Sequence, residues 1–590
     1  MNGASGTLEP RRSPGSARRR GALAALLVSA AMTYSLAVFG PPFYTKGEPR
    51  EAVVVQRIVR HGEILLPRRL EHELPTKPPL FHWLGAAASV AVGRIDEATV
   101  RLPSLLASLL ALALTVTTGY RLFGTTAGLT AGIVLATSQQ WIASSVTARV
   151  DMTLAAAITL AMLAFLHEFE SGRRPVPWLF YVGCSLGVLA KGPVGCILPI
   201  LTVGIFLALA RERDYARRLR PLLGAAILAV PLVWYVLAAR SGGPAFVGNV
   251  FAENVLRMID ADAENLGHRR GPLYYLPALL AGMLPWSPLL LPAAHELWRR
   301  RGASTDTRRL FLVAWTGVTV AFYSLAESKR PVYLLSCYPA LALLVGDWLA
   351  RRFETAQAGT PSDGRSWIAG MVALLILLPV ALVALQACGV PTFTVFGGFL
   401  SAGDRANLSA VTSSLATRPI TVGAWTAITS SLTVMLALAI RHGAWRRAFG
   451  SMALLVAATV MITAPTFFRD LAETQSIASF VAEAVDRAPE AEALYYYSST
   501  SAHSELSFFR AFEYAATFYA RRPLRVVDDP HSAGIDDRLL FLAAEPSFVE
   551  LERRATTEKT DGVRYRAVAR YTYNDNPRRV PVVLVEGIRH

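Results

Sequence analysis

The chain has 590 residues, of which 53% are hydrophobic and only 17% are charged, and its mean hydropathy is +0.37. This composition excludes an ordinary soluble protein of the same length. The net charge of +16 would suit a nucleic-acid-binding protein. The arginines, however, stand in short segments between apolar runs, where membrane topology and anionic lipid headgroups explain them better, so we expect membrane lipids as partners and no nucleic acid.

Apolar runs that approach the roughly 20 residues of a membrane span recur along most of the chain. The first follows the basic residues Arg18–Arg20 and shows no clean cleavage site of small residues, so we interpret it as a retained anchor and not as a signal peptide. We predict about 13 transmembrane helices. They cover residues 21–40, 102–120, 125–143, 152–167, 178–190, 194–210, 221–239, 273–294, 310–326, 332–350, 367–387, 419–440 and 450–466.

Two kinds of charged segment alternate between these runs. The first is short and rich in arginine, as the positive-inside rule expects of cytoplasmic loops. It occurs at Arg11–Arg20, Arg173–Arg174, Arg211–Arg220, Arg299–Arg309, Arg351–Arg352 and Arg441–Arg447. The second kind carries sparse, mixed charges and must then share the outer face. Residues 1–20 are therefore expected to be a basic cytoplasmic tail, and residues 21–466 the transmembrane domain.

The first outer segment, about residues 41–101, contains two helical patterns that are too short for clear spans. Ala52–Val59 is amphipathic, and Pro79–Val92 is apolar but interrupted by His82. We predict that both are interfacial helices that lie along the membrane surface.

From about Phe467 the hydrophobic runs shorten to strand length and alternate with helical stretches. Strands are predicted at 494–497, 524–527, 539–542, 563–573 and 580–585, with helices around 504–519 and 546–553. Residues 467–590 therefore predict a small α/β domain, which an odd number of spans places outside the membrane.

Three carboxylates on the outer face are candidate catalytic bases: Glu48, Glu51 and Asp151. A carboxylate held near an apolar surface has a raised pKa and can serve as a general base. The structural alternative for Glu48 and Glu51 is the ordinary preference of glutamate for the first turn of a helix. For Asp151 the alternative is an ion pair with Arg149 or Lys191.

Cations on the same face are candidate ligands of a phosphate, because lysine and arginine bind it by charge and hydrogen bonds. They are Arg50, Lys77, Lys191, His268, Arg270 and Lys329, with Tyr333 beside the last of them. The structural alternative is that lysines at a membrane boundary merely extend toward water. The four cysteines lie in or beside predicted spans without metal-ligand spacing, so no cofactor is indicated, although a divalent metal stays possible.

Several motifs together resemble the bacterial membrane glycosyltransferases of the GT-C fold, related to the lipid A aminoarabinose transferase and the protein O-mannosyltransferases. The resemblance rests on the ordered set Gly47–Arg50, Thr76–Leu84, Arg101–Ser104, Lys191–Pro193, His268–Pro277 and Ser328–Pro339. It implies a polytopic α-helical protein of the bacterial inner membrane that moves a sugar from a polyprenyl-phosphate donor to an acceptor outside the membrane, with inversion at the sugar carbon. That acceptor is a lipid A, another glycolipid, a glycan or a protein.

One position departs from the family pattern. The family carries its catalytic aspartate at the start of the first motif, where this chain has Gly47. The resemblance then implies that Glu48, Glu51 or Asp151 takes the proton of the acceptor, or that this branch is inactive. Two other functions remain as alternatives: a lipid or solute transporter, and an inactive membrane scaffold whose outer domain binds a partner.

Overall fold

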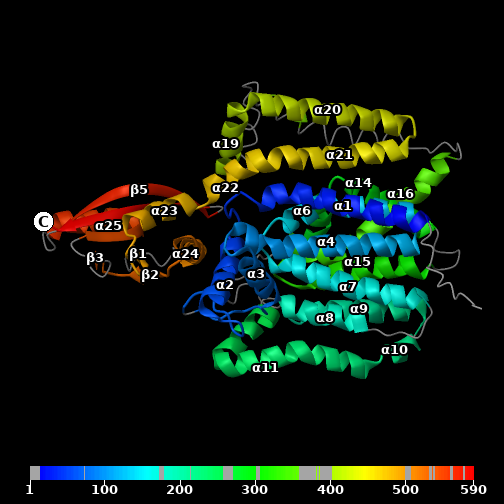
Figure 1. Cartoon of the computed structure of the whole chain (residues 1–590), viewed down its shortest axis with the longest axis horizontal. Coiled ribbons are helices and arrows are strands. Elements are labelled where there is room, and N and C mark those ends of the chain that lie inside the picture. The colour runs from blue at the N-terminus through cyan, green and yellow to red at the C-terminus, as the bar shows by residue number, and fades with distance from the viewer. Residues whose placement is uncertain are drawn as a thin grey trace, which may run out of the picture.

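The structure is a computed structural model. It describes residues 14–71, 73–171, 178–212, 214–256, 270–299, 306–357, 380–381, 385, 402–497, 506–529, 534–535, 538–558, 563–575 and 578–589. In this part of the chain a bundle of long helices lies side by side, and a mixed sheet extends from one end of the bundle (Figure 1). The fold class predicted from the sequence, a polytopic helical bundle with a small C-terminal α/β domain, is confirmed.

The first half of the bundle comprises α1 to α11. Their bounds are α1 Pro14–Val38, α2 Gly47–His61, α3 Leu80–Val92, α4 Glu97–Leu122, α5 Thr125–Ala136, α6 Gln139–Ser145, α7 Val150–Ser171, α8 Trp178–Lys191, α9 Val194–Ala210, α10 Tyr215–Arg218 and α11 Pro221–Phe251.

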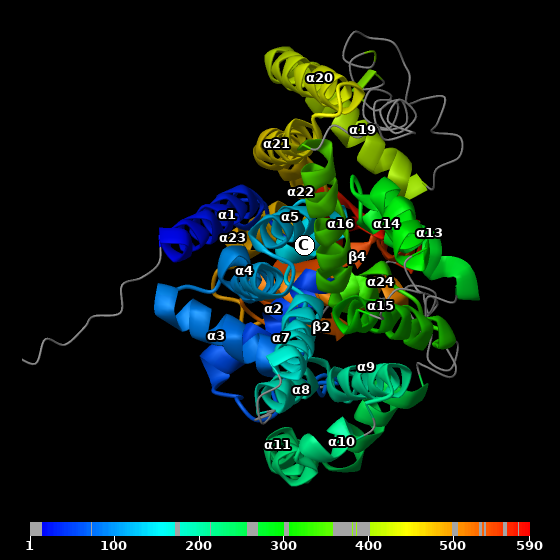
Figure 2. The same cartoon turned by 90° about the vertical axis from the view of Figure 1, so that its right-hand side faces the viewer.

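The second half runs from η1 to η4. Its elements are η1 Ala252–Leu256, η2 Pro272–Tyr274, α13 Tyr275–Gly282, α14 Ser287–Arg299, α15 Thr307–Leu325, η3 Pro331–Cys337, α16 Tyr338–Gln357, α19 Ala402–Thr417, α20 Pro419–Arg441, α21 Trp445–Thr463 and η4 Ala464–Phe468. Figure 2 shows the bundle end-on, with α10 and α11 at one margin and α20 at the other.

Seven of the described helices are long and apolar enough to cross a membrane, or up to eight if α13 and α14 form one broken span. Four shorter apolar helices, α3, α5, α8 and α9, accompany them. The predicted number of about 13 spans is therefore not confirmed, although helices occupy the predicted segments that the structure describes. The predicted span 367–387 lies almost wholly outside the described residues.

Two predicted spans differ from the helices found. The segment predicted at 273–294 is bent by 111° between α13 and α14. Pro285 lies in this break. Proline has no backbone N–H to donate to the helical hydrogen bond, and its ring clashes with the carbonyl of the preceding turn. The segment predicted at 125–143 is divided into α5 and α6 at Ser138, whose backbone is extended.

The bundle packs around a continuous apolar core, because its facing helices carry small residues that let their backbones approach. α4, α5 and α16 meet through Gly119, Gly128 and Gly346, where a Cβ atom would collide with a neighbouring backbone. Small residues at helix contacts are the usual device of membrane bundles, in which van der Waals packing replaces the hydrophobic effect. Trp141 and Trp315 are fully buried in this core.

The C-terminal domain is built from two short helices, a sheet and two longer helices. Its elements are α22 Arg469–Gln475, α23 Ala478–Arg487, β1 Leu494–Tyr497, α24 Leu506–Ala520, β2 Leu524–Val527, β3 Gly534–Ile535, β4 Arg538–Ala544, α25 Glu545–Glu558, β5 Val563–Asp575 and β6 Arg578–Arg589. The sheet has the order β2-β1-β4-β6-β5, with β3 paired to β4. β2, β1 and β4 are parallel to one another, β6 pairs antiparallel with β4, and β5 pairs antiparallel with β6.

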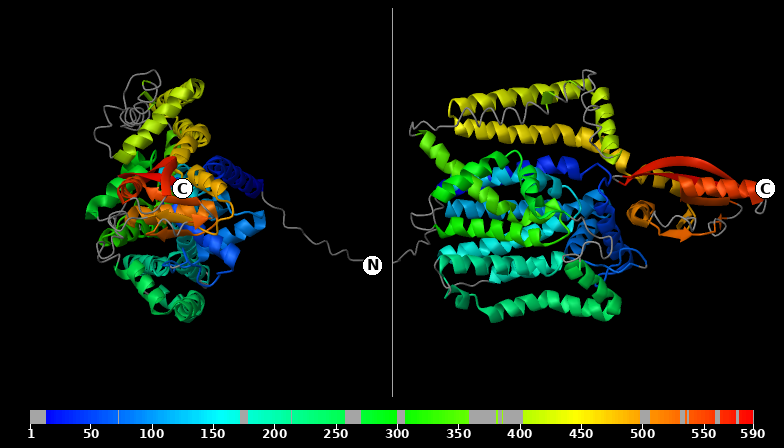
Figure 3. Two further views of the ribbon diagram at one scale, coloured as in Figure 1. Left: turned by 90° about the vertical axis from the view of Figure 1, so that its left-hand side faces the viewer. Right: turned by 180° about the vertical axis from the view of Figure 1, so that it is seen from behind.

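The predicted strands and both longer helices of this domain are found; the sequence missed β3, α22 and α23. The two interfacial segments of the sequence prediction are also helices, α2 and α3. They lie at the end of the bundle that faces the sheet, as Figure 1 and the rear view of Figure 3 show.

The C-terminal domain is attached to this end through α24, which packs along α2. The Tyr519 hydroxyl donates to Glu97 at 2.9 Å and accepts the Phe43 N–H at 3.0 Å. The Tyr514 hydroxyl donates to Glu73 at 2.5 Å, and Phe518 packs in one apolar cluster with Phe43. The domain therefore holds the helix that carries the candidate carboxylates.

Candidate active site at the sheet-facing end of the bundle

Glu51 is the centre of a buried ion-pair cluster. Its Oε1 accepts from Arg50 at 2.7 Å and from Lys77 at 3.1 Å, and its Oε2 lies 2.8 Å from His82 Nε2. The side chains of Glu51 and His82 are each 4% exposed, and that of Lys77 is 12% exposed. The interfacial helices α2 and α3 thus bring together charges that lie about 30 residues apart in the sequence.

The environment shifts the pKa values of these groups. Burial would raise the pKa of the Glu51 carboxyl, but Lys77, Arg50 and His82 together hold it well below its ordinary value. Burial, aided by the neighbouring charge of Arg50, lowers the pKa of Lys77 to about 8 despite the attraction of Glu51. Burial also lowers the pKa of His82. Glu51 is therefore a carboxylate at neutral pH, and Lys77 titrates close to neutrality.

Glu48, one turn earlier on α2, has a different environment. It is fully buried, and its Oε1 accepts from Arg101 Nε at 2.8 Å and from the Ala148 N–H at 3.1 Å. Its Oε2 accepts from the Thr45 hydroxyl at 3.1 Å. The rest of the Arg101 guanidinium donates to the backbone carbonyls of Pro41 and Pro42. These bonds tie α2, α4 and the start of α7 together.

A second ion pair joins the start of α7 to the end of α8. Lys191 donates to Asp151, and its ammonium lies 4.2 Å above the ring of Tyr333. Tyr333 in turn packs against Tyr323 of α15, with 5.1 Å between ring centroids. The ion pair considered for Asp151 in the sequence is therefore present, with Lys191 as its partner.

A small cavity of about 110 Å³ lies between the two ion pairs. Lys77, Lys191, Glu253, Asn254 and Tyr333 are among the residues that line it. Two cations from distant segments thus face one small cavity, with an aromatic ring on its wall. Such an arrangement suits an anionic group of the size of a phosphate.

Gly192 explains the close approach of η1 to this cavity. Its φ is +86°, in the left-handed region, and a Cβ atom on it would lie 2.7 Å from Asn254 Oδ1. Only glycine therefore lets Lys191 end α8 while Asn254 and Glu253 pack beside it. Glu253 was not predicted as a site residue, and the only sequence signal was its position in the outer loop after the glycine pair at 242–243.

Gly47, the position of the family's aspartate, faces the guanidinium of Arg149. A Cβ atom at Gly47 would lie 3.3 Å from Arg149 Nη2. Within the described residues, Glu48, Glu51 and Asp151 each pair with another cation, and no ion pair of Arg149 is found. A positive charge, not a negative one, therefore occupies this part of the site.

The remaining predicted cations do not line the cavity. Arg270 is exposed, with its guanidinium 5.9 Å from the ring centroid of Tyr274. Lys329 is buried and donates to the carbonyl of Ala326, and Arg50 is directed to Glu51. His268 lies outside the described residues. In the parts of the chain that are described, no three His, Cys, Asp or Glu side chains converge as a metal site would require.

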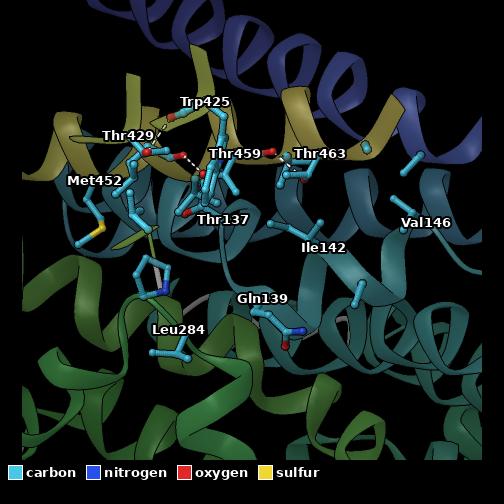
Figure 4. Close-up of a pocket in the computed structure, with 18 of the residues that line it drawn as sticks. Thr137, Gln139, Ile142, Val146, Leu284, Trp425, Thr429, Met452, Thr459 and Thr463 are labelled. Atoms are coloured by element: carbon cyan, nitrogen blue, oxygen red, sulfur yellow. Dashed lines mark hydrogen bonds between the residues drawn. The ribbon is translucent and has the colours of Figure 1, made fainter. Parts of the chain in front are cut away.

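A larger, apolar cavity of about 420 Å³ lies within the bundle, between α1, α6, α20 and α21. Figure 4 shows threonine and aliphatic side chains on its walls, among them Thr137, Ile142, Thr429 and Met452. Tyr44 lines it as well, next to Glu48 in the segment that leads into α2. The cavity therefore begins close to the ion-pair clusters. The sequence analysis did not predict it, because its walls come from helices far apart in the chain.

Comparison with known proteins relates this site to a class of enzymes. Residues 76–237 match the family described as dolichyl-phosphate-mannose-protein mannosyltransferase. The undecaprenyl phosphate-alpha-4-amino-4-deoxy-L-arabinose arabinosyl transferase of Enterobacter sp. (strain 638) is 25% identical over 60% of this chain and 64% of its own. The protein of the same name from Pseudomonas aeruginosa is 28% identical over 57% of this chain and 61% of its own. The chain thus spans less than two thirds of the length of these relatives.

Solved structures of ArnT match the fold of this chain over nearly its whole length. ArnT from Cupriavidus metallidurans bound to undecaprenyl phosphate superposes with a TM-score of 0.70 at 20% identity, and the match covers 97% of this chain and 98% of that chain. Its apo state gives a TM-score of 0.69. The chain is therefore similar to the GT-C glycosyltransferases that use polyprenyl-phosphate-linked sugars, as its motifs predicted. In particular, it has the fold of ArnT, including the C-terminal domain.

Proposed function

We propose that this protein is a membrane glycosyltransferase that moves a sugar from a polyprenyl-phosphate donor to an acceptor on the outer side of the bacterial inner membrane. The observation that carries the proposal is the pair of lysines, Lys77 and Lys191, on one small cavity at the end of the bundle that bears the interfacial helices. The similarity to the aminoarabinose transferases favours an aminopentose as the sugar. Since the acceptor lies on the outer side of the membrane in this proposal, we expect the C-terminal domain, which adjoins the same end of the bundle, in the periplasm.

In this proposal the donor phosphate enters the small cavity and binds Lys77 and Lys191. Negative charge builds on that phosphate as its bond to the sugar carbon breaks, and fixed cations in a site of low dielectric stabilise the charge strongly. Tyr333 limits the cavity and orients the Lys191 ammonium. Because the charge is supplied by side chains, we expect transfer to withstand EDTA; loss of transfer that Mg²⁺ or Mn²⁺ restores would instead reveal a metal.

The arriving phosphate also changes the carboxylates. Lys77 and Lys191 now hold Glu51 and Asp151, respectively, in the ionised form. When the lysines turn toward the phosphate, each carboxylate loses stabilising charge, and its pKa rises toward that of an effective base. We propose that Glu51 or Asp151 accepts the proton of the acceptor hydroxyl. Glu48 is instead a positioning residue, because it is fully buried and both Arg101 and the Ala148 N–H donate to its Oε1.

The apolar cavity offers space for a hydrocarbon chain of a lipid substrate. Its volume of about 420 Å³ and its position between membrane-spanning helices suit an isoprenoid or acyl chain. Its end near Tyr44 would direct the head of that lipid toward the ion-pair clusters.

The testing experiment is sugar transfer by the purified protein in lipid, with a panel of labelled polyprenyl-phosphate sugars and with envelope glycolipids as acceptors. Lys77→Gln and Lys191→Gln should each abolish most transfer. Arg94→Gln is the matched control, since Arg94 is an outer-face cation that is 67% exposed and pairs with Asp96 away from the cavity. Donor binding without transfer by the wild type would favour an inactive scaffold. Movement of the intact lipid-linked sugar across the bilayer would favour a transporter.

A further inference from the structure

A third cavity, of about 260 Å³, lies at the junction between the interfacial helix α2 and the C-terminal domain. We call it the junction pocket. It is a separate cavity from the site described above: Arg60, on its wall, follows Glu51 by nine residues, about two and a half helical turns, so the two side chains leave α2 on opposite sides. The far wall is formed by the end of α24 and the residues that follow it.

Arginine dominates the charge of the junction pocket. Five arginines line it: Arg57 and Arg60 from α2, Arg69 from the following loop, and Arg521 and Arg522 after α24. Three carboxylates line it as well, and Glu63 and Glu73 pair with Arg57 and Arg69 from beside the lining. Most of its lining residues are charged or polar, and Phe, Tyr and Trp are absent from it, which disfavours a hydrocarbon chain as the occupant.

The protein neutralises two of these arginines, since Arg69 pairs with Glu73 at 3.0 Å, whereas Arg60, Arg521 and Arg522 form no ion pair in the described part of the chain. Arg57 pairs with Glu63 at 2.5 Å, but its buried Nε has no hydrogen-bond partner among the described residues. Arg60 donates to the Arg521 carbonyl at 2.9 Å, and Arg522 donates to the carbonyls of Ala488 and Ala491. A carbonyl accepts a hydrogen bond without neutralising the cation.

Two further features indicate that like charges are held together here. Burial and the proximity of Arg521 lower the pKa of Arg60, the direction expected of a cation that faces another cation. Arg521 itself has φ +59°, a left-handed conformation that residues other than glycine adopt at a cost of about 1 kcal/mol or more. An anion between the two guanidinium groups would relieve their repulsion.

We propose that the junction pocket binds a phosphate-bearing ligand. Guanidinium groups match phosphate oxygens with paired hydrogen bonds, and Arg60, Arg521 and Arg522 can supply such bonds because they form no ion pair in the described part of the chain. Gln56 and Thr517 on the same walls can bond hydroxyl groups of the phosphate's carrier. Because α2 supplies one wall and the C-terminal domain the other, the ligand would fasten the domain to the helix that carries Glu51. The phosphate belongs either to a soluble ester or to the headgroup of a membrane lipid.

The test measures binding of inorganic phosphate to the full-length purified protein by calorimetry. It is done in a Lys77→Gln/Lys191→Gln background, so that the proposed donor cavity does not contribute. We expect saturable binding that Arg521→Gln weakens at least about tenfold, as loss of a charged hydrogen bond predicts. Arg521→Lys should restore part of the affinity. Arg564→Gln, which removes an exposed arginine from β5, should leave the affinity unchanged.

Nanodiscs distinguish the two sources of phosphate. Competition of phosphatidic acid, but not phosphatidylcholine, with inorganic phosphate would identify a lipid headgroup; binding of phosphate without such competition would identify a soluble ester. The proposal is overturned if the background protein shows no saturable phosphate binding, or if Arg521→Gln and Arg564→Gln bind phosphate equally well. Neither result bears on sugar transfer, which is measured separately.

Discussion

Replacement of Glu48 by glutamine separates a positioning role from a catalytic one. Glu48 is fully buried, pairs with the equally buried Arg101 at 2.8 Å and accepts the Ala148 N–H. Removing one partner of a buried ion pair typically costs about 3–5 kcal/mol, because the other charge stays buried without compensation. Glutamine keeps one oxygen that can accept from Arg101, so we expect Glu48→Gln to lower the free energy of unfolding by about 3 kcal/mol, the lower end of this range.

The assay is thermal unfolding of the purified protein in detergent, together with sugar transfer normalised to folded protein. Glu48→Gln should lower the midpoint clearly. The control is Glu473→Gln, because Glu473 is exposed and pairs with Arg469 at the surface. It should change the free energy of unfolding by at most about 1 kcal/mol. Adding Arg101→Met to Glu48→Gln should recover part of the loss, because the unpaired cation is removed. A Glu48→Gln protein with wild-type stability and no transfer would refute this reasoning and make Glu48 the base.

Three further predictions follow from the site and the domain junction. Donor affinity should fall as the pH rises through about 8, because the phosphate binds the protonated form of Lys77, whose pKa is about 8. Lys77→Arg should flatten this pH dependence in a donor-binding titration. An equally steep profile in that variant would assign the titration to another group. Gly47→Asp should raise the unfolding midpoint by an amount equivalent to about 1 kcal/mol, through a new ion pair with Arg149 and a favourable charge in the first turn of α2. The gain should vanish in an Arg149→Gln background, and a gain that persists there would show that the ion pair does not form. Tyr519→Phe should cost about 1–3 kcal/mol, because it leaves the Phe43 N–H without its acceptor at the domain junction; unchanged unfolding would mean that water replaces the hydroxyl.

The sequence was informative wherever periodicity determines the structure. β1 and β2 were predicted with the bounds that the structure gives them, and β5 to within two residues, because alternation is a local property of the chain. For α2 and β6 only the central half was predicted. Breaks in helices were harder to place: Pro285 signals one, but only packing decides whether a proline bends a span or ends it.

The ion pairs of the site could not be predicted from local sequence patterns. Glu48 and Glu51 are one helical turn apart and look alike in sequence, yet one pairs with Arg101 in the bundle and the other with Lys77 beside the small cavity. Their partners lie tens of residues away, so which cation meets which carboxylate follows from how α2, α3 and α4 pack. The same reason explains why Lys329, predicted as a phosphate ligand, donates to a carbonyl instead.

The most direct test of the account is single-turnover transfer from undecaprenyl-phosphate-linked aminoarabinose by the wild type and by Lys77→Gln/Lys191→Gln, both in lipid and both checked for correct folding. The account predicts transfer by the wild type and its loss, with weakened donor binding, in the double variant. Transfer that survives removal of both lysines would contradict the assignment of the small cavity as the donor phosphate site.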